Sequence, residues 1–103
     1  MTILGVDLGT TNSLAVVYKE GKPVLIPNAF NEYITPSVVS ILNGKIVVGK
    51  LAKERLVTHP EYSASLFKRT MGSDVTYTLD RKEYDSATLS SFVVKQLIED
   101  AQN

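Results

Sequence analysis

The segment GVDLGTTNS, residues 5–13, contains Asp7, two glycines and two threonines between two apolar runs. Residues 2–7 and 13–19 are short and rich in β-branched residues, which predicts two strands with a tight turn between them. Glycine lets a backbone adopt a positive φ or approach a ligand closely, and successive N–H groups of a tight loop can bind phosphate. From the residues alone, two interpretations stay open: a plain turn, which is the more frequent case, and a phosphate-binding loop.

Composition limits the classes of protein that fit this sequence. The chain has 103 residues, 44% of them hydrophobic, and its 11 basic and 11 acidic residues give a net charge of zero. This size predicts one small domain or a piece of a larger one, and the balance of charge argues against binding to nucleic acid or to an anionic membrane. There is no cysteine, so thiolate metal sites are excluded within this sequence, and the single histidine, His59, argues against a histidine-based metal site or a catalytic triad.

The pattern along the chain predicts an antiparallel meander, two hairpins and several helical segments. The strands are expected at residues 2–7, 13–19, 23–26, 35–42, 45–49 and 75–79, with the last one turning back through residues 80–85. Residues 27–34 are expected to form a loop, and Asn43-Gly44 a two-residue hairpin turn. Helical segments are expected at residues 50–58, with Leu51, Ala52 and Leu56 on one side, at 63–72 as a short helix or turn, and at 87–102.

The last segment has the clearest helical pattern. Its buried face is predicted to contain Leu89, Phe92, Val93, Leu97, Ile98 and Ala101. Ser86 is the expected N-cap residue. Because the helix has no glycine or proline stop and its apolar stripe needs a partner, we expect the chain to be a piece of a longer protein. A second hypothesis is that the isolated chain self-associates.

The opening loop has groups suited to a nucleotide without matching the common glycine-rich motifs. It lacks the pattern of a P-loop and that of a dinucleotide-binding fingerprint, and it leads into a strand. The hydroxyls of Thr10 and Thr11 can donate to phosphate, and the carboxylate of Asp7 suits Mg²⁺ or its water ligands.

GVDLGTTNS resembles the first phosphate motif of the superfamily that contains actin, hexokinase and the heat-shock chaperones. Two further segments, IPNAFNEYITPSVVSI (26–41) and VVGKLAKERLVTHPEYSASLFKRTMG (47–72), are similar to DnaK-type heat-shock chaperones, and the likeness covers nearly all 103 residues. It implies an α/β fold, α+β within this piece: a partial actin-like, ribonuclease H-like ATPase lobe with a β-meander, a small hairpin subdomain and a C-terminal helix. Residues 1–27 would be phosphate-loop strands of the core subdomain, 28–85 an exposed small subdomain and 86–103 a helix returning to the core.

The sequence also departs from the common pattern of these chaperones. Tyr33 stands where most members have arginine, and Arg55 where they commonly have glutamine. After Gly72, Ser73-Asp74-Val75 replaces the usual arginine-rich continuation. These differences favour the HscC-like branch and leave the choice of clients and co-chaperones open.

The resemblance implies a role for each residue of the loop and for one lysine. Thr10 and Thr11, with the backbone of Asn12, would contact the β- and γ-phosphates of ATP or ADP, and Gly9 would supply the backbone bend. Asp7 would place Mg²⁺, and also K⁺, through water. Lys68, in LFKRTMG, would reach the γ-phosphate and act in hydrolysis, whereas its residue type alone predicts an ordinary exposed lysine.

The implied parent is a cytoplasmic chaperone that couples ATP hydrolysis to peptide binding and release. Its implied partners are client peptides, a J-domain co-chaperone and a nucleotide exchange factor, with no nucleic acid and no membrane; the isolated piece is expected to lack ATP turnover. The alternatives are a carbohydrate kinase of the same superfamily and a non-enzymatic β-rich interaction module. The cluster Lys50, Lys53, Glu54 and Arg55 is expected to be an exposed helix face, with a co-chaperone surface as its weaker interpretation, and His59 a helix-end residue.

Overall fold

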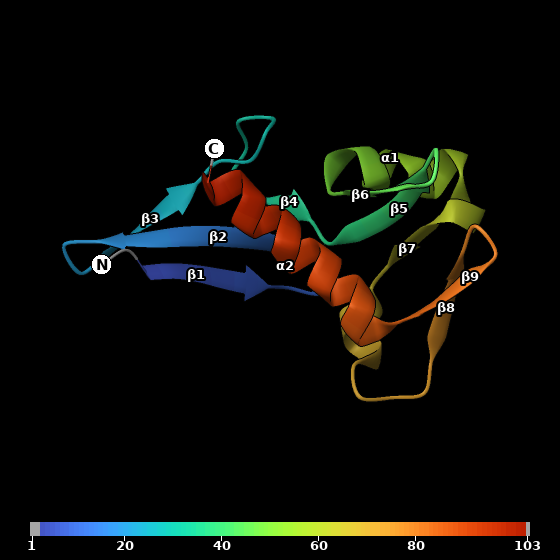
Figure 1. The fold of residues 1–103 in the computed structure, drawn as a ribbon. Coiled ribbons are helices and arrows are strands. Elements are labelled where there is room, and N and C mark those ends of the chain that lie inside the picture. Colours follow the sequence, from blue (N-terminus) through green and yellow to red (C-terminus); the bar gives the residue numbers. More distant parts are fainter. Residues whose placement is uncertain (1–2, 103) are drawn as a thin grey trace.

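The computed structural model describes residues 3–102, which form nine strands, two α-helices and two short 3-10 helices (Figure 1). The strands are β1 (Ile3–Leu8), β2 (Asn12–Lys19), β3 (Lys22–Ile26), β4 (Thr35–Pro36), β5 (Val38–Leu42), β6 (Lys45–Val48), β7 (Ser63–Ser65), β8 (Thr76–Leu79) and β9 (Lys82–Asp85). The helices are α1 (Lys50–Thr58), α2 (Ser86–Gln102), η1 (Pro60–Tyr62) and η2 (Phe67–Thr70). This mixed content agrees with the predicted fold class. Within residues 3–102, neither α-helix combines the length and apolar character needed to cross a membrane.

The first three strands form the predicted antiparallel meander. β1 pairs with β2 from Ile3↔Tyr18 to Leu8↔Ser13, which leaves only residues 9–12 for the connection. The predicted start of the first strand at Thr2 lies outside the described residues. In the turn between β2 and β3, Glu20 and Gly21 have φ values of 51° and 76°. Positive φ values at both positions are what a two-residue hairpin turn needs in order to match the twist of its strands.

The hairpin at Asn43-Gly44 is also confirmed, but the strand that leads into it differs from the prediction. Residues 35–42 do not form one strand: β4 pairs with β2 in the first sheet, whereas β5 pairs with β6 and β7 in a second sheet. Ser37 lies between β4 and β5, outside both strands. The chain therefore changes sheet at Ser37, which the continuous apolar pattern of TPSVVSIL could not reveal because both parts are extended.

The prediction of a helix or turn over residues 63–72 is wrong for its first three residues. Ser63–Ser65 form strand β7, because they pair with β5 from Val38↔Ser65 to Ser40↔Ser63 and bury Ala64. This pairing joins residues more than twenty positions apart, so local propensity could not show it. The rest of the segment forms the 3-10 helix η2 and turns at Gly72, whose φ is 80°.

The long helix α2 joins the parts of the chain. Figure 1 shows it, in orange to red, crossing the meander, and it contacts β1 and β2 as well as β5 and β6 of the second sheet. Its residues Leu89, Val93 and Leu97 are buried in the core, as the pattern predicts. Ile98 is 37% exposed, so the apolar stripe is wider than the face that this chain covers. In the same way, Ala52 of α1 is fully buried, but Leu51 is 39% exposed.

Asp85, rather than the predicted Ser86, caps the N-terminus of α2. The Asp85 carboxylate accepts a hydrogen bond of 2.7 Å from the backbone N–H of Thr88, three residues further on, which is the geometry of an N-cap side chain. Ser86 is the first residue of the helix and is buried, with its hydroxyl hydrogen-bonded to Oγ1 of Thr70. The prediction was wrong by one residue because aspartate and serine are equally good caps and stand side by side here.

This cap makes the stability of the fold depend on pH in a defined direction. The side chain of Thr88, and then its backbone N–H, lower the pKa of the Asp85 carboxyl below its ordinary value of 3.8. A carboxyl whose pKa is lowered by folding stabilises the fold above its unfolded pKa, and that contribution is lost as the pH falls through the folded pKa. We expect Asp85→Asn, which keeps the capping oxygen without the charge, to lower the melting temperature at about pH 6 and to have less effect at about pH 3.

Thermal unfolding of both chains followed by circular dichroism measures this effect. The control is Asp74→Asn, which removes another exposed carboxylate that accepts no hydrogen bond within residues 3–102. A constant difference in melting temperature between Asp85→Asn and the unchanged chain at both pH values would contradict the assignment.

Candidate functional site

The connection between β1 and β2 is a tight loop that only glycine can begin. A Cβ atom added to Gly9 would lie 2.2 Å from the carbonyl oxygen of Asn12. Gly9 is not among the glycines with a positive φ, which are Gly21, Gly44, Gly49 and Gly72. Of the two reasons for which a loop needs glycine, close approach of the backbone is the one that applies here.

Ser37, at the junction between the two sheets, holds this loop from outside. Its backbone N–H donates to the carbonyl of Thr11 at 2.9 Å, and its hydroxyl donates to the carbonyl of Gly9 at 2.9 Å. Oγ of Ser13 lies 2.8 Å from Oγ of Ser37, and both side chains are 2% exposed. Because the single hydroxyl proton of Ser37 goes to Gly9, Ser13 must be the donor between the two serines.

These hydrogen bonds fix which way the peptide groups of the loop point. No peptide bond in the described chain is cis, so the carbonyl of each residue is opposed to the N–H of the next one. The carbonyls of Gly9 and Thr11 point to Ser37, and the N–H groups of Thr10 and Asn12 therefore point away from it. With these two carbonyls paired on one side, the loop presents the N–H groups of Thr10 and Asn12 on the other, and N–H donors that share one side of a tight loop can bind an anion.

The predicted site residues around the loop have accessible side chains. Asp7, Thr11 and Asn12 are exposed, and Thr10 is half-buried. Within residues 3–102, Asp7 forms no salt bridge, and no group of three or more histidine or acidic residues is placed to hold a metal ion. The loop therefore provides hydroxyls, amides and one carboxylate, and a cation held directly by several carboxylates does not fit it.

Lys68 is held on a separate, well-anchored segment. It lies in η2 between Phe67, which is 1% exposed, and Thr70, whose Oγ1 is 2.9 Å from the hydroxyl of Tyr77. The residue before the helix, Leu66, has a φ of 59°, so the chain turns sharply into η2. The Lys68 side chain itself is exposed and makes no salt bridge within residues 3–102. The backbone is thus fixed while the ammonium group is accessible.

The structure places the loop and the segment of Lys68 beside the same hollow. This open hollow, of about 700 Å³, lies along α2 and is lined mainly by apolar atoms. Leu8, the residue before the loop, and Met71, three residues after Lys68, both line it. No hydrogen bond joins Lys68 to residues 9–12, so the structure brings the loop and Ser37 into contact and Lys68 only into their neighbourhood.

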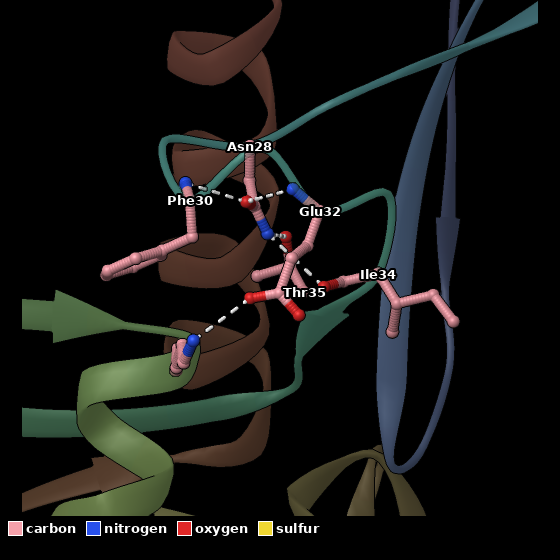
Figure 2. Close-up of polar contacts among 6 residues, drawn as sticks. Asn28, Phe30, Glu32, Ile34 and Thr35 are labelled. Carbon is pink, nitrogen blue, oxygen red and sulfur yellow. Dashed lines mark hydrogen bonds and ion pairs between the residues drawn. The ribbon is translucent and has the colours of Figure 1, made fainter.

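The side chain of Asn28 organises the predicted loop before β4 through four hydrogen bonds (Figure 2). Its Oδ1 accepts from the N–H groups of Phe30 and Glu32 at 2.9 and 3.1 Å, and its Nδ2 donates to the carbonyl of Ile34 and to Oγ1 of Thr35 at 3.2 and 3.1 Å. Thr35 is buried and begins the strand that pairs with β2. Asn28 therefore fixes the approach of the chain to Ser37.

Comparison with known proteins decides the family. The family model described as Hsp70 protein matches residues 3–102. This chain belongs to the Hsp70 family. It is 42% identical over 102 residues to the chaperone protein DnaK of Thermotoga neapolitana, and the match covers 97% of this chain and 17% of that relative. The resemblance inferred from the sequence motifs is confirmed at the level of DnaK-type Hsp70, while the HscC-like branch stays a prediction.

Two positions at which this Hsp70 sequence departs from the common pattern have different environments. Tyr33 is 55% exposed on the loop organised by Asn28. Arg55 is half-buried: its Nε donates to Oγ of Ser40 and its Nη2 to the carbonyl of Ile41, both at 2.8 Å. The prediction that Arg55 belongs to an exposed helix face is therefore wrong, because its guanidinium ties α1 to β5.

The other members of that predicted face remain accessible. Lys53 and Glu54 are exposed, and Lys50 forms a salt bridge of 3.2 Å with Glu32 in which both side chains are about half exposed. His59 follows α1 directly, as predicted, and its Nδ1 lies 2.8 Å from Oγ1 of Thr58.

The sequence alone did not identify Ser37 and Ser13 as parts of this Hsp70 site. A weak signal was present, because Ser13 begins the apolar run of β2 and Ser37 directly precedes the apolar run of β5. A polar side chain in such a position needs a hydrogen-bond partner, and here the partners are each other and the loop.

Proposed function

We propose that this chain is the N-terminal part of the ATP-binding and ATP-hydrolysing domain of a DnaK-type chaperone. The observation that supports the proposal best is the loop of residues 9–12, in which the carbonyls of Gly9 and Thr11 are paired with Ser37 and the amides of Thr10 and Asn12 point the opposite way. The chain spans 17% of the length of the DnaK that it matches, so the activity proposed is that of a longer protein.

The loop suits a polyphosphate in its chemistry. The hydroxyls of Thr10 and Thr11 and the N–H of Asn12 would donate to the β- and γ-phosphates of ATP or ADP, and Gly9 keeps the loop tight enough for these donors to converge. Several donors from one tight loop bind an anion well because they lose little freedom on binding. The proposed cofactor is therefore ATP or ADP.

The exposed carboxylate of Asp7, at the end of β1, suits Mg²⁺ held through water, and K⁺ by the same means. When bound, Mg²⁺ neutralises part of the charge on the phosphates. We assign Asp7 to orienting these waters and Lys68 to stabilising the charge that develops on the transferred phosphoryl group.

The three predicted parts of the chain fit this proposal. Residues 1–27 would form the phosphate-binding strands, 28–85 the exposed small subdomain, and 86–103 the helix that returns to the core. The parent would act in the cytoplasm and couple hydrolysis to binding and release of client peptides, with a J-domain co-chaperone and a nucleotide exchange factor as partners. Such coupling requires two states of the protein that nucleotide and peptide favour differently.

The other candidate functions have less support. A carbohydrate kinase shares the opening loop only, whereas the Hsp70 match extends over residues 3–102. A non-enzymatic interaction module would not need the loop to be held by a buried pair of serines.

We further propose that the isolated chain self-associates through the hollow along α2, where Leu8, Val94 and Ile98 leave an apolar surface.

The isolated chain is expected to bind Mg-ATP weakly and to hydrolyse none. One loop without opposing charges in a closed cleft lacks most of the preorganisation that makes such donors effective. Isothermal titration calorimetry compares the isolated chain with a full-length protein that carries it: we expect binding in the full-length protein and a dissociation constant above about 1 mM in the chain alone. Micromolar binding by the isolated chain would contradict this expectation, and no binding by the full-length protein would overturn the proposed function.

A further inference from the structure

Ser37 takes part in two features of the structure, the junction between the two sheets and the loop between β1 and β2. It is the residue at which the chain leaves the first sheet for the second, and it contacts the loop of residues 9–12 through both its backbone and its side chain. Its hydroxyl reaches a carbonyl 28 positions earlier in the sequence. The loop is thus held by a residue that belongs to neither of the strands that flank it.

We propose that Ser37 is a positioning residue for the phosphate loop, which aims the amides of Thr10 and Asn12 at the phosphates by holding the carbonyls of Gly9 and Thr11. This inference rests on the proposed function and adds to it a residue that does not touch the nucleotide. Its backbone bond to Thr11 is available to any residue except proline. The bond from its hydroxyl to Gly9 depends on the side chain.

The hydroxyl bond controls the orientation of one particular peptide group. The carbonyl of Gly9 and the N–H of Thr10 belong to the same planar unit, so a rotation of that unit moves both. With the carbonyl paired to Ser37, the unit has one favoured orientation; without that bond, it is free to turn its carbonyl toward the phosphates. A carbonyl aimed at a phosphate replaces attraction by repulsion.

Ser13 extends this arrangement into a chain of hydrogen bonds. Ser13 donates to Ser37, and Ser37 donates to Gly9, so the Ser37 hydroxyl is both an acceptor and a donor. Hydrogen bonds in such a chain polarise and strengthen one another. Both serines are 2% exposed, so water does not readily replace either partner.

The test uses a full-length protein that carries this segment and compares ATP with adenosine, which lacks phosphates. We expect Ser37→Ala to weaken the affinity for Mg-ATP about tenfold, the effect of about one hydrogen bond with its orientation, and to leave the affinity for adenosine within about twofold. Ser13→Ala removes only the outer hydrogen bond and is expected to weaken ATP binding about threefold, with the same selectivity. Calorimetry measures both affinities.

A second readout does not depend on nucleotide. In the protein labelled with ¹⁵N-threonine and free of nucleotide, Ser37→Ala is expected to shift the amide resonance of Thr10, because its peptide unit reorients. Ser40→Ala is the matched control: Ser40 is fully buried on the neighbouring strand, but its hydroxyl contacts Tyr62, Ser63 and Arg55 instead of the loop. It is expected to lower thermal stability without changing the ratio of the two affinities or the Thr10 resonance.

The outcomes distinguish a failure of the role proposed for Ser37 from a failure of the proposed function. ATP affinity unchanged in Ser37→Ala, or equal losses for ATP and adenosine, would show that Ser37 does not position the loop. If Ser37→Ala does not fold, Ser13→Ala decides by the same ratio. Failure of the unchanged protein to bind ATP at all would overturn the proposed function instead.

Discussion

Lys68→Met, in a full-length protein that carries this segment, is expected to reduce the kcat of ATP hydrolysis about 100- to 1,000-fold, with KM for ATP changed less than about threefold. A fixed cation beside the transferred phosphoryl group acts mainly on the charge that develops in the transition state, so its loss lowers kcat more than ground-state binding. The anchoring of η2 through Phe67 and Thr70 supports this role, because it fixes the backbone from which an accessible ammonium group extends.

Arg69→Met is the matched control for this measurement. Arg69 is the next residue of the same 3-10 helix and is also exposed, so the two variants remove one positive charge each from the same turn. Steady-state phosphate release measures kcat and KM, and thermal unfolding checks that both variants fold. Equal rates for the two variants, or an unchanged rate in Lys68→Met, would remove Lys68 from the catalytic machinery.

The parts of the fold that depend on local sequence could be predicted, and those that depend on distant pairing could not. Two-residue turns such as Asn43-Gly44 and the buried face of α2 follow from residue type and spacing, and both are present. The strand Ser63–Ser65 has a weak local pattern and exists because β5 supplies its partner. The change of sheet at Ser37 likewise depends on which strands lie beside residues 35–42.

The residues of the candidate site also differ in whether local sequence could identify them. The loop residues from Gly9 to Asn12 are contiguous, so a motif of a few letters identifies them together. Ser37 acts on that loop from 28 positions away, and only the folded chain shows that its hydroxyl reaches Gly9. Lys68 came from the family resemblance alone, since an exposed lysine on a short helix has no distinctive signal of its own.

Gly9→Ala is expected to disable the loop even though it adds a single methyl group. The added Cβ would lie 2.2 Å from the carbonyl oxygen of Asn12, a backbone atom of strand β2 that cannot turn aside as a side chain could, because Asn12 pairs with Pro36 of β4. The loop must therefore open. We expect a loss of about 1–3 kcal/mol in the free energy of unfolding, and ATP affinity reduced more than tenfold.

Gly5→Ala tests whether this result depends on the loop rather than on adding a methyl group to β1. Gly5 lies four residues before Gly9, on the strand that leads into the loop. A Cβ added to Gly5 would meet Cγ2 of Val16 at 3.0 Å, and this side-chain atom can make room by a small movement. Denaturant unfolding and ATP calorimetry on both variants give the two quantities. If the two variants lose ATP affinity equally, the tightness of the loop at Gly9 is not what binding requires. If only Gly9→Ala loses ATP affinity, glycine is required at this position because two backbone segments lie close together. Gly9 and Ser37 then serve the same purpose, since both keep the loop in the one shape in which its amides converge.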